Sequence, residues 1–172
     1  PLRRGLDAGR RPAGLRVNAV GAADALLDAF EAAWTARNPT GFSAMCAPDV
    51  HYEDPFCTTP LEGPAAIGRY AERLWAGFPD VRVDRSGERL TDGRYVAAPV
   101  KVVGTNSGEL EGLPPTRRFV VVQAVLYCEL TADGDALFRV RAFCDRYEAA
   151  IQLGLLPKPG TLGEKALLAL RG

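Results

Sequence analysis

Two short stretches of the chain carry carboxylates in places where acid–base chemistry is possible. The first is "HYEDP" at residues 51–55, and the second is Asp145, at the end of the strand-like segment 137–145. A carboxylate in an apolar, poorly hydrated place can remove a proton next to a carbonyl or activate a water molecule, because its pKa rises toward neutrality there. Asp54 and Asp145 are therefore the candidate catalytic residues.

Both candidates also have a structural interpretation. A strand as short as the one around Asp54 exposes alternate side chains to water, and acidic residues such as Glu53 and Asp54 are mostly exposed. Glu148 follows Asp145 by three residues, and D-x-x-E at a strand-to-helix junction has the layout of a capping box. Asp145 is thus predicted to begin a helix, and a role in a pocket stays open as the alternative.

An amide interrupts one of the apolar strand-like runs. Gln123 lies within "FVVVQAVLY" and shares its alternation with Val125 and Tyr127. A buried amide needs hydrogen-bond partners, so Gln123 either orients a ligand carbonyl or is a satisfied core residue. We predict that Gln123, Val125 and Tyr127 line a ligand pocket together with Trp34 and Tyr52. For the aromatic residues the alternative is a place in the core.

The last strand-like segment offers a wholly apolar face. Val140 and Ala142 alternate with Arg139 and Arg141, so one face of this strand has no ionisable side chain. We predict that Val140 and Ala142 form the pocket face of this strand. No general base is expected there.

These residues are positioned by helices in the first half of the chain and by strands in the second. Apolar residues at helical spacing predict helices at residues 22–37 and 42–46, within "GPAAIGRYAERLWAGFPD", where Gly77 and Pro79 end the helix, and within "LGEKALLALRG" at the end of the chain. Alternating residues predict strands at residues 81–90, 95–104, 117–129 and 137–145. The Asp-Gly pairs in "TDGR" and "ADGD" favour tight hairpin turns between strands. Helices followed by antiparallel strands predict an α+β fold.

Composition and charge exclude several classes of partner. Lys plus Arg and Asp plus Glu each number 21 among 172 residues, so no overall field favours nucleic acid or an acidic membrane surface. No apolar run reaches the roughly 18 residues of a membrane span, and the N-terminus lacks an apolar signal segment, so we expect a cytoplasmic protein. The four cysteines have no metal-ligand spacing and are expected to be free thiols. Neither a metal nor another cofactor is predicted.

The N-terminal segment differs in composition from the rest. Residues 1–21 mix Arg with Gly, Pro and Ala without a sustained period, so they are predicted to form a flexible basic arm. The alternative is an arm that docks on a partner subunit. Residues 22–172 form the predicted α+β domain.

Several motifs occur in a characteristic order: "APDVHYEDP", "EGPAAI", "FPD", "GTNSGELEGLPPTRR" and "IQLGLLP". In this order they resemble the SnoaL-like polyketide cyclases of the nuclear transport factor 2-like superfamily, which also holds ketosteroid isomerases and limonene epoxide hydrolases. The resemblance implies a cone-shaped α+β barrel, with N-terminal helices that cover a curved, mostly antiparallel sheet around a deep apolar pocket. It also implies a homodimer that binds a small apolar or polyketide-like ligand.

The chain departs from this family at the positions of its best-known chemical groups. Counted back from the "QLG" motif, the family's second Asp falls on Asp145, its catalytic base on Ala142, and its histidines on Val140 and near Val125. In the long loop, Asn106 stands where a His often follows the Gly-Thr pair.

The function that the resemblance implies is a cyclase or isomerase of secondary metabolism, including antibiotic biosynthesis. Since the last strand lacks a base, the shape of the pocket is expected to direct much of the reaction. The alternatives are a binding protein without catalysis and an epoxide hydrolase-type enzyme that opens or closes a ring.

The cap interpretation of Asp145 predicts the effects of two substitutions. Asp145→Ala removes the acceptor for the first N–H groups of the helix and is expected to lower the free energy of unfolding by about 1 kcal/mol. Asp145→Asn is the matched control and should keep most of the stability, because Asn caps a helix about as well as Asp. Chemical denaturation of the three proteins measures both differences. Equal losses in the two variants would contradict the cap.

Overall fold

The structure is a computed structural model that describes residues 13–110 and 112–170. Its helices are α1 Ala13–Ala36, the short 3₁₀ helix η1 Gly41–Ala44, α2 Pro64–Gly77, α3 Arg146–Leu153 and α4 Leu162–Ala169. Helix α1 begins earlier than the predicted start at residue 22. The first part of the predicted arm, residues 1–12, lies outside the described residues.

The strands form one seven-stranded sheet with the order β2-β1-β7-β6-β5-β3, and β4 pairs with β5. Their bounds are β1 Cys46–Glu53, β2 Leu61–Glu62, β3 Arg82–Arg85, β4 Leu90–Thr91, β5 Tyr95–Thr105, β6 Phe119–Leu130 and β7 Leu137–Cys144. All neighbours are antiparallel except β1 and β7, which run parallel. The α+β class and the curved, mostly antiparallel sheet are confirmed, and the sheet is open, because its two end strands do not pair with each other.

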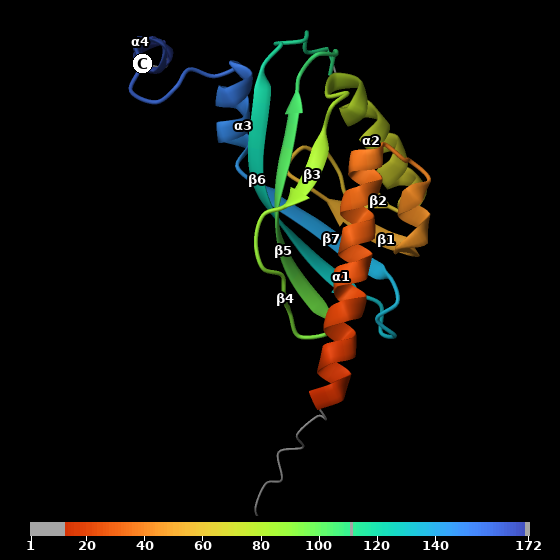
Figure 1. Ribbon diagram of the computed structural model, residues 1–172. Coiled ribbons are helices and arrows are strands. Elements are labelled where there is room, and N and C mark those ends of the chain that lie inside the picture. The colour runs from red at the N-terminus through yellow and green to blue at the C-terminus, as the bar shows by residue number, and fades with distance from the viewer. Residues whose placement is uncertain (1–12, 111, 171–172) are drawn as a thin grey trace, which may run out of the picture.

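The helices are distributed unevenly around the sheet (Figure 1). Helices α1 and α2 lie on one side of it, α3 packs beside β6, and α4 projects away from the sheet. None of the helices in the described part of the chain combines the length and apolar character that crossing a bilayer requires.

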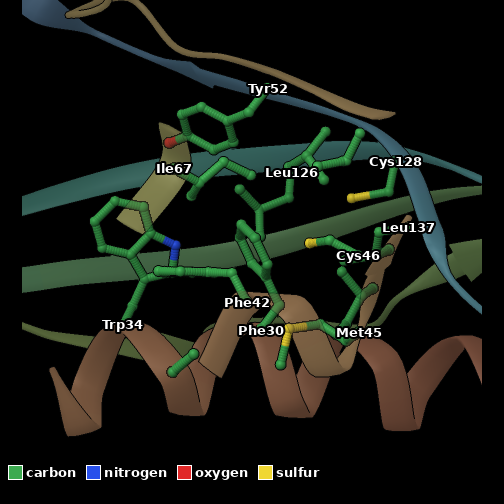
Figure 2. Close-up of a cluster of buried hydrophobic side chains, with 14 of the residues drawn as sticks. Phe30, Trp34, Phe42, Met45, Cys46, Tyr52, Ile67, Leu126, Cys128 and Leu137 are labelled. Carbon is green, nitrogen blue, oxygen red and sulfur yellow. The ribbon is translucent and has the colours of Figure 1, made fainter. Parts of the chain in front are cut away.

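The main core lies between α1 and the inner face of the sheet. Phe30 and Trp34 are one turn apart on α1 and point toward Tyr52 and Leu126 of the sheet (Figure 2). The Phe42 ring packs edge-on against both helix aromatics, with centroid distances of 5.5 Å to Phe30 and 5.4 Å to Trp34. Such edge-to-face pairs stabilise the core beyond the area that they bury. The helical spacing of the apolar residues thus fixes which face of α1 meets the sheet.

The register between β6 and β7 decides which residues form the inner face. Leu126 lies opposite Ala142, and Cys128 lies opposite Val140. Directly opposed residues of an antiparallel pair share a face, so the even-numbered residues of β6 share the inner face with those of β7 from Val140 onward. Val140 is fully buried, and Ala142 packs against the core. The prediction that these two residues share the inner face is confirmed.

Helix α3 starts at the predicted cap. Asp145 Oδ1 accepts hydrogen bonds from the backbone N–H groups of Tyr147 at 2.8 Å and Glu148 at 3.1 Å. The Glu148 carboxylate accepts a bond from the Gln152 amide at 3.0 Å. Asp145 is therefore confirmed as the N-cap of α3.

The side chain of Gln152 fixes α3 to the sheet. Its Oε1 accepts from the Val121 N–H at 2.7 Å, and its Nε2 donates to the Val121 carbonyl at 3.0 Å. The amide pairs with the backbone of β6 much as a residue of a neighbouring strand would. Helix α3 is thereby held over one end of the inner face.

The long loop between β5 and β6 is anchored by the buried side chain of Asn106. Its Nδ2 donates to the carbonyls of Gly77 at 3.3 Å and Gly108 at 3.1 Å, and its Oδ1 accepts from the Thr116 N–H at 2.7 Å. Gly108 lies so close to the end of α2 that a Cβ atom built on it would overlap the carbonyl oxygen of Ala76. The loop therefore needs glycine at this position.

The close approach of Gly108 predicts a large effect of one added methyl group. Gly108→Ala should lower the free energy of unfolding by about 1–3 kcal/mol, because the backbone of α2 cannot yield as a side chain can. The matched control is Gly21→Ala in α1, where a Cβ meets nothing within 4 Å. That variant should be as stable as the native protein or slightly more stable, since Ala favours helix. Thermal denaturation compares the two, and equal effects would contradict the steric argument.

Candidate functional site

A cavity of about 200 Å³ lies between the helices and the inner face of the sheet. Its walls come from α1, from α2 and the turn after it, from α3, and from the long loop, which contributes Leu110. Its floor consists of inward-facing residues of β5, β6 and β7, such as Val100, Ala124, Leu126 and Ala142. Almost every lining side chain is apolar. The cavity is therefore apolar, and a polar side chain in it has few neighbours to hydrogen-bond.

Asp54 is the only carboxylate among the described residues that line this cavity. It follows β1 directly, and its Oδ1 accepts the backbone N–H groups of Phe56 at 2.7 Å and Cys57 at 2.9 Å. The intervening residue, Pro55, has no N–H to offer, so the turn begins with Phe56 as donor. The side chain of Asp54 is thus folded back over its own turn and held at one end of the cavity.

Two buried phenols complete the surroundings of Asp54. The Tyr52 hydroxyl donates to Oδ2 at 2.8 Å. The Tyr70 hydroxyl lies 2.8 Å from Oδ2 and 3.0 Å from Oδ1. Asp54 therefore accepts hydrogen bonds from four groups, two on the backbone and two on side chains.

Burial raises the pKa of both phenols well above its ordinary value, and the negative charge of Asp54 raises it further. Tyr52 and Tyr70 therefore keep their protons at neutral pH. Both are neutral hydrogen-bond donors to Asp54, and of the two only Tyr52 lines the cavity.

Two thiols, Cys57 and Cys144, lie close to the same carboxylate. Burial raises the pKa of both, and the charge of Asp54 adds to the effect. Neither has the lowered pKa of a reactive cysteine, so neither is suited to act as a thiolate nucleophile. All four cysteines are free thiols, as predicted. Among the described residues, no group of three or more His, Cys, Asp or Glu side chains could hold a metal ion.

Four of the predicted site residues meet at the cavity: Trp34, Tyr52, Asp54 and Ala142. Val140 lies on the same face but is packed in the core rather than along the cavity. Asp145 is exposed and caps α3, so it does not line the cavity. Of the two carboxylates singled out in the sequence, only Asp54 is placed for chemistry on a bound ligand.

The predicted placement of Gln123, Val125 and Tyr127 in the pocket is wrong. Val125 lies opposite Phe143, on the outer face of the sheet, where Val125 is 40% exposed and Tyr127 is 41% exposed. Gln123 shares this face and is also exposed. The physical reason is a register shift of one residue next to the turn, between Glu129 and Leu130, which changes the residues that share a face. The homodimer stays a prediction.

Tyr70 is the site residue that spacing alone does not reveal. It lies on the apolar face of α2 with Ile67 and Ala71, where an aromatic residue is usually part of the core. The signal that could have found it is its hydroxyl, because a buried O–H needs an acceptor. The neighbouring strand end supplies one in Asp54.

Comparisons with known proteins agree with this architecture. Residues 27–141 match the family model of the SnoaL-like domain. No curated protein sequence matches the chain.

Similar solved structures cover most of the chain at low sequence identity. AclR from Streptomyces galilaeus is 20% identical, with a TM-score of 0.68 over 88% of this chain and 92% of its own. A candidate SnoaL-like polyketide cyclase from Jannaschia sp. CCS1 is 19% identical, with a TM-score of 0.69 over 87% of this chain and 100% of its own. IdmH from Streptomyces antibioticus, a candidate polyketide cyclase, is 19% identical, with a TM-score of 0.66 over 77% of this chain and 98% of its own. At this identity the likeness supports the fold.

The raised pKa values of the two phenols predict how stability depends on pH. Unfolded tyrosines lose their protons near pH 10, whereas Tyr52 and Tyr70 in the native state hold theirs to higher pH. Their contribution to the free energy of unfolding is therefore complete below about pH 10 and falls as the pH rises further, by about 1.4 kcal/mol per pH unit for each phenol.

Tyr70→Phe removes one of these two groups. The free energy of unfolding, measured by urea denaturation from about pH 9 to 11.5, should fall less steeply in this variant than in the native protein. An identical slope in the two proteins would show that the native Tyr70 does not hold its proton more tightly than the unfolded chain does.

Proposed function

Because the chain belongs to the SnoaL-like domain family, we propose that it is a small-molecule cyclase or isomerase whose catalytic base is Asp54. One observation carries this proposal: Asp54 is the only carboxylate among the described residues that line an apolar cavity, and two phenols donate to it. The similarity to candidate polyketide cyclases supports a polyketide-like substrate, and with it a place in secondary metabolism.

The chemistry that fits this site is proton transfer at a carbon next to a carbonyl. An Asp54 oxygen accepts the proton, and the electron pair of the broken C–H bond moves into an enolate. The developing charge lies on the substrate oxygen, which needs a hydrogen-bond donor in a cavity that is otherwise apolar. Tyr52 is the phenolic donor that lines the cavity, whereas Tyr70 does not line it, and both remain protonated.

Tyr52 is the donor that can turn to the substrate, because its side chain lines the cavity and that of Tyr70 does not. The Tyr52 hydroxyl makes a single bond of 2.8 Å to Oδ2 of Asp54, whereas the Tyr70 hydroxyl is shared between the two oxygens at 2.8 and 3.0 Å. When Tyr52 donates to a substrate carbonyl instead, Asp54 regains a free acceptor position for the incoming proton. Binding of the carbonyl and activation of the base are thus coupled.

Two outcomes of the same enolate correspond to the two reaction types. In an isomerase, Asp54 returns the proton to another carbon of the conjugated system. In a cyclase, the enolate carbon attacks a second carbonyl of the same molecule, a C–C bond forms, and the new alkoxide takes the proton back from Asp54. The apolar walls then hold the substrate in the reactive conformer, so the shape of the cavity determines which atoms meet.

A binding protein without catalysis is the second candidate. The observation that favours it is the full set of donors around Asp54, because a carboxylate whose two oxygens already accept hydrogen bonds from four groups is a less available base. In that case Asp54 only orients the phenol of Tyr52 toward a ligand carbonyl. The two candidates differ in whether a bound ketone loses its α-proton.

Asp54→Asn tests the proposal. Exchange of the acetyl protons of 2-acetylnaphthalene for solvent deuterium, followed by NMR, should be catalysed by the native protein and slowed by roughly 10²–10⁴-fold in this variant, since the amide cannot accept the proton.

The matched control is Glu53→Gln. Glu53 is the adjacent carboxylate, but it pairs with Arg141 and does not line the cavity, so exchange should be unchanged. Native-like exchange in Asp54→Asn would remove Asp54 as the base. Binding of the ketone with no exchange even in the native protein would favour the non-catalytic candidate.

A further inference from the structure

The charges and the size of the cavity restrict its ligand more narrowly than the reaction type does. We propose that it selects an uncharged, compact ligand: a neutral ketone of one or two rings that lies over Ala124 and Ala142, with its carbonyl toward the phenol of Tyr52. This inference rests on the proposed function, because it describes the substrate of the same site. It adds the charge and the upper size limit of the part of the substrate that enters the cavity.

The lining excludes anions. Among its described residues there is no Lys, Arg or His, and the only charged side chain is Asp54. The Arg146 guanidinium lies outside, over the Phe56 ring at 5.9 Å, on a side chain that is exposed. A carboxylate inside the cavity would lose its hydration, face the like charge of Asp54 and find no cation to pair with.

Ammonium ligands are disfavoured for a different reason. A protonated primary amine brings three N–H donors, and each needs an acceptor when buried. The oxygens of Asp54 already accept bonds from four groups, and the remaining lining side chains are almost entirely apolar. A neutral carbonyl needs only a donor, which Tyr52 can supply from the cavity wall while Asp54 keeps its three other donors.

The volume limits the number of rings. An engineered apolar cavity of about 150 Å³ accommodates benzene, so a cavity of about 200 Å³ takes one ring with substituents or a small bicycle.

Small side chains on adjacent positions of the sheet create this space. Ala142 lies opposite Leu126, and Ala124 lies opposite Cys144, next to Asp54. A third ring would have to project through the mouth of the cavity.

Charge selection is tested with three one-ring probes: acetophenone, benzoate and benzylamine, which is a protonated primary amine at pH 7.5. Calorimetric titration of the native protein at this pH should show binding of acetophenone, with benzoate weaker by roughly 100-fold. Asp54→Asn should recover at least tenfold of that difference for benzoate, because the like charge is gone. Benzoate or benzylamine binding as tightly as acetophenone would overturn the inference, and so would the absence of acetophenone binding.

Size selection is tested with ketones of one to three rings. 2-Acetylnaphthalene should bind the native protein at least tenfold more tightly than 2-acetylanthracene, and Ala142→Leu should weaken 2-acetylnaphthalene at least tenfold. The matched control is Ala32→Leu on the exposed face of α1, which should bind like the native protein. Equal binding of the two- and three-ring ketones would overturn the size limit without requiring any variant to fold.

The outcomes separate this inference from the proposed function. Loss of deuterium exchange in Asp54→Asn together with equal binding of benzoate and acetophenone would retain the base and refute the charge selection. The reverse pattern, with selective binding and exchange that does not depend on Asp54, would retain the ligand class and refute the base.

Discussion

The hydrogen bonds around the Asp54 carboxylate are the interaction on which the site depends. Their donors come from the turn after β1, from β1 itself and from α2. A carboxylate at the edge of an apolar cavity is stable only when such donors replace the water that it has lost. The strand, the turn and the helix must therefore meet at one point. That requirement places a polar group at the end of an otherwise apolar cavity before any ligand enters it.

Local patterns in the sequence predicted the elements well, because each depends on neighbouring residues. The spacing of Phe30 and Trp34 identified the buried face of α1, and the pair Asp145 and Glu148 identified the start of α3. The pairing of β6 with β7 could not be predicted in the same way. It depends on the extra residue beside the β6–β7 turn, which places Val125 opposite Phe143 rather than on the inner face. The alternation of β6 does indicate its inner face, because the even-numbered positions from 120 to 130 are all apolar whereas Gln123 and Glu129 stand at odd positions.

The candidate site shows the same limit. Asp54 was recognisable because it precedes a proline at the end of a strand-like run. Tyr52 was recognisable because it lies in the same run, two residues before Asp54. Tyr70 was not, because it reaches Asp54 across sixteen residues through the packing of α2 on β1. Contacts of this kind follow from tertiary structure and leave no periodic trace. They also determine the chemistry of the site, since phenols with a raised pKa stay protonated and can donate a hydrogen bond to an oxygen that gains charge during a reaction.

The amide of Gln152 also affects whether another chain can associate with the edge of the sheet. Strand β6 starts at Phe119, but its pairing with β7 starts only at Ala124, which lies opposite Cys144, the last residue of β7. Without Gln152, the N–H and the carbonyl of Val121 would therefore be unpaired along this edge of β6. Such edges are templates on which another chain can add a strand. Because one side chain of α3 occupies both groups, the helix that covers the cavity also protects the sheet from growth. Local unfolding of α3 would therefore expose an aggregation-prone edge.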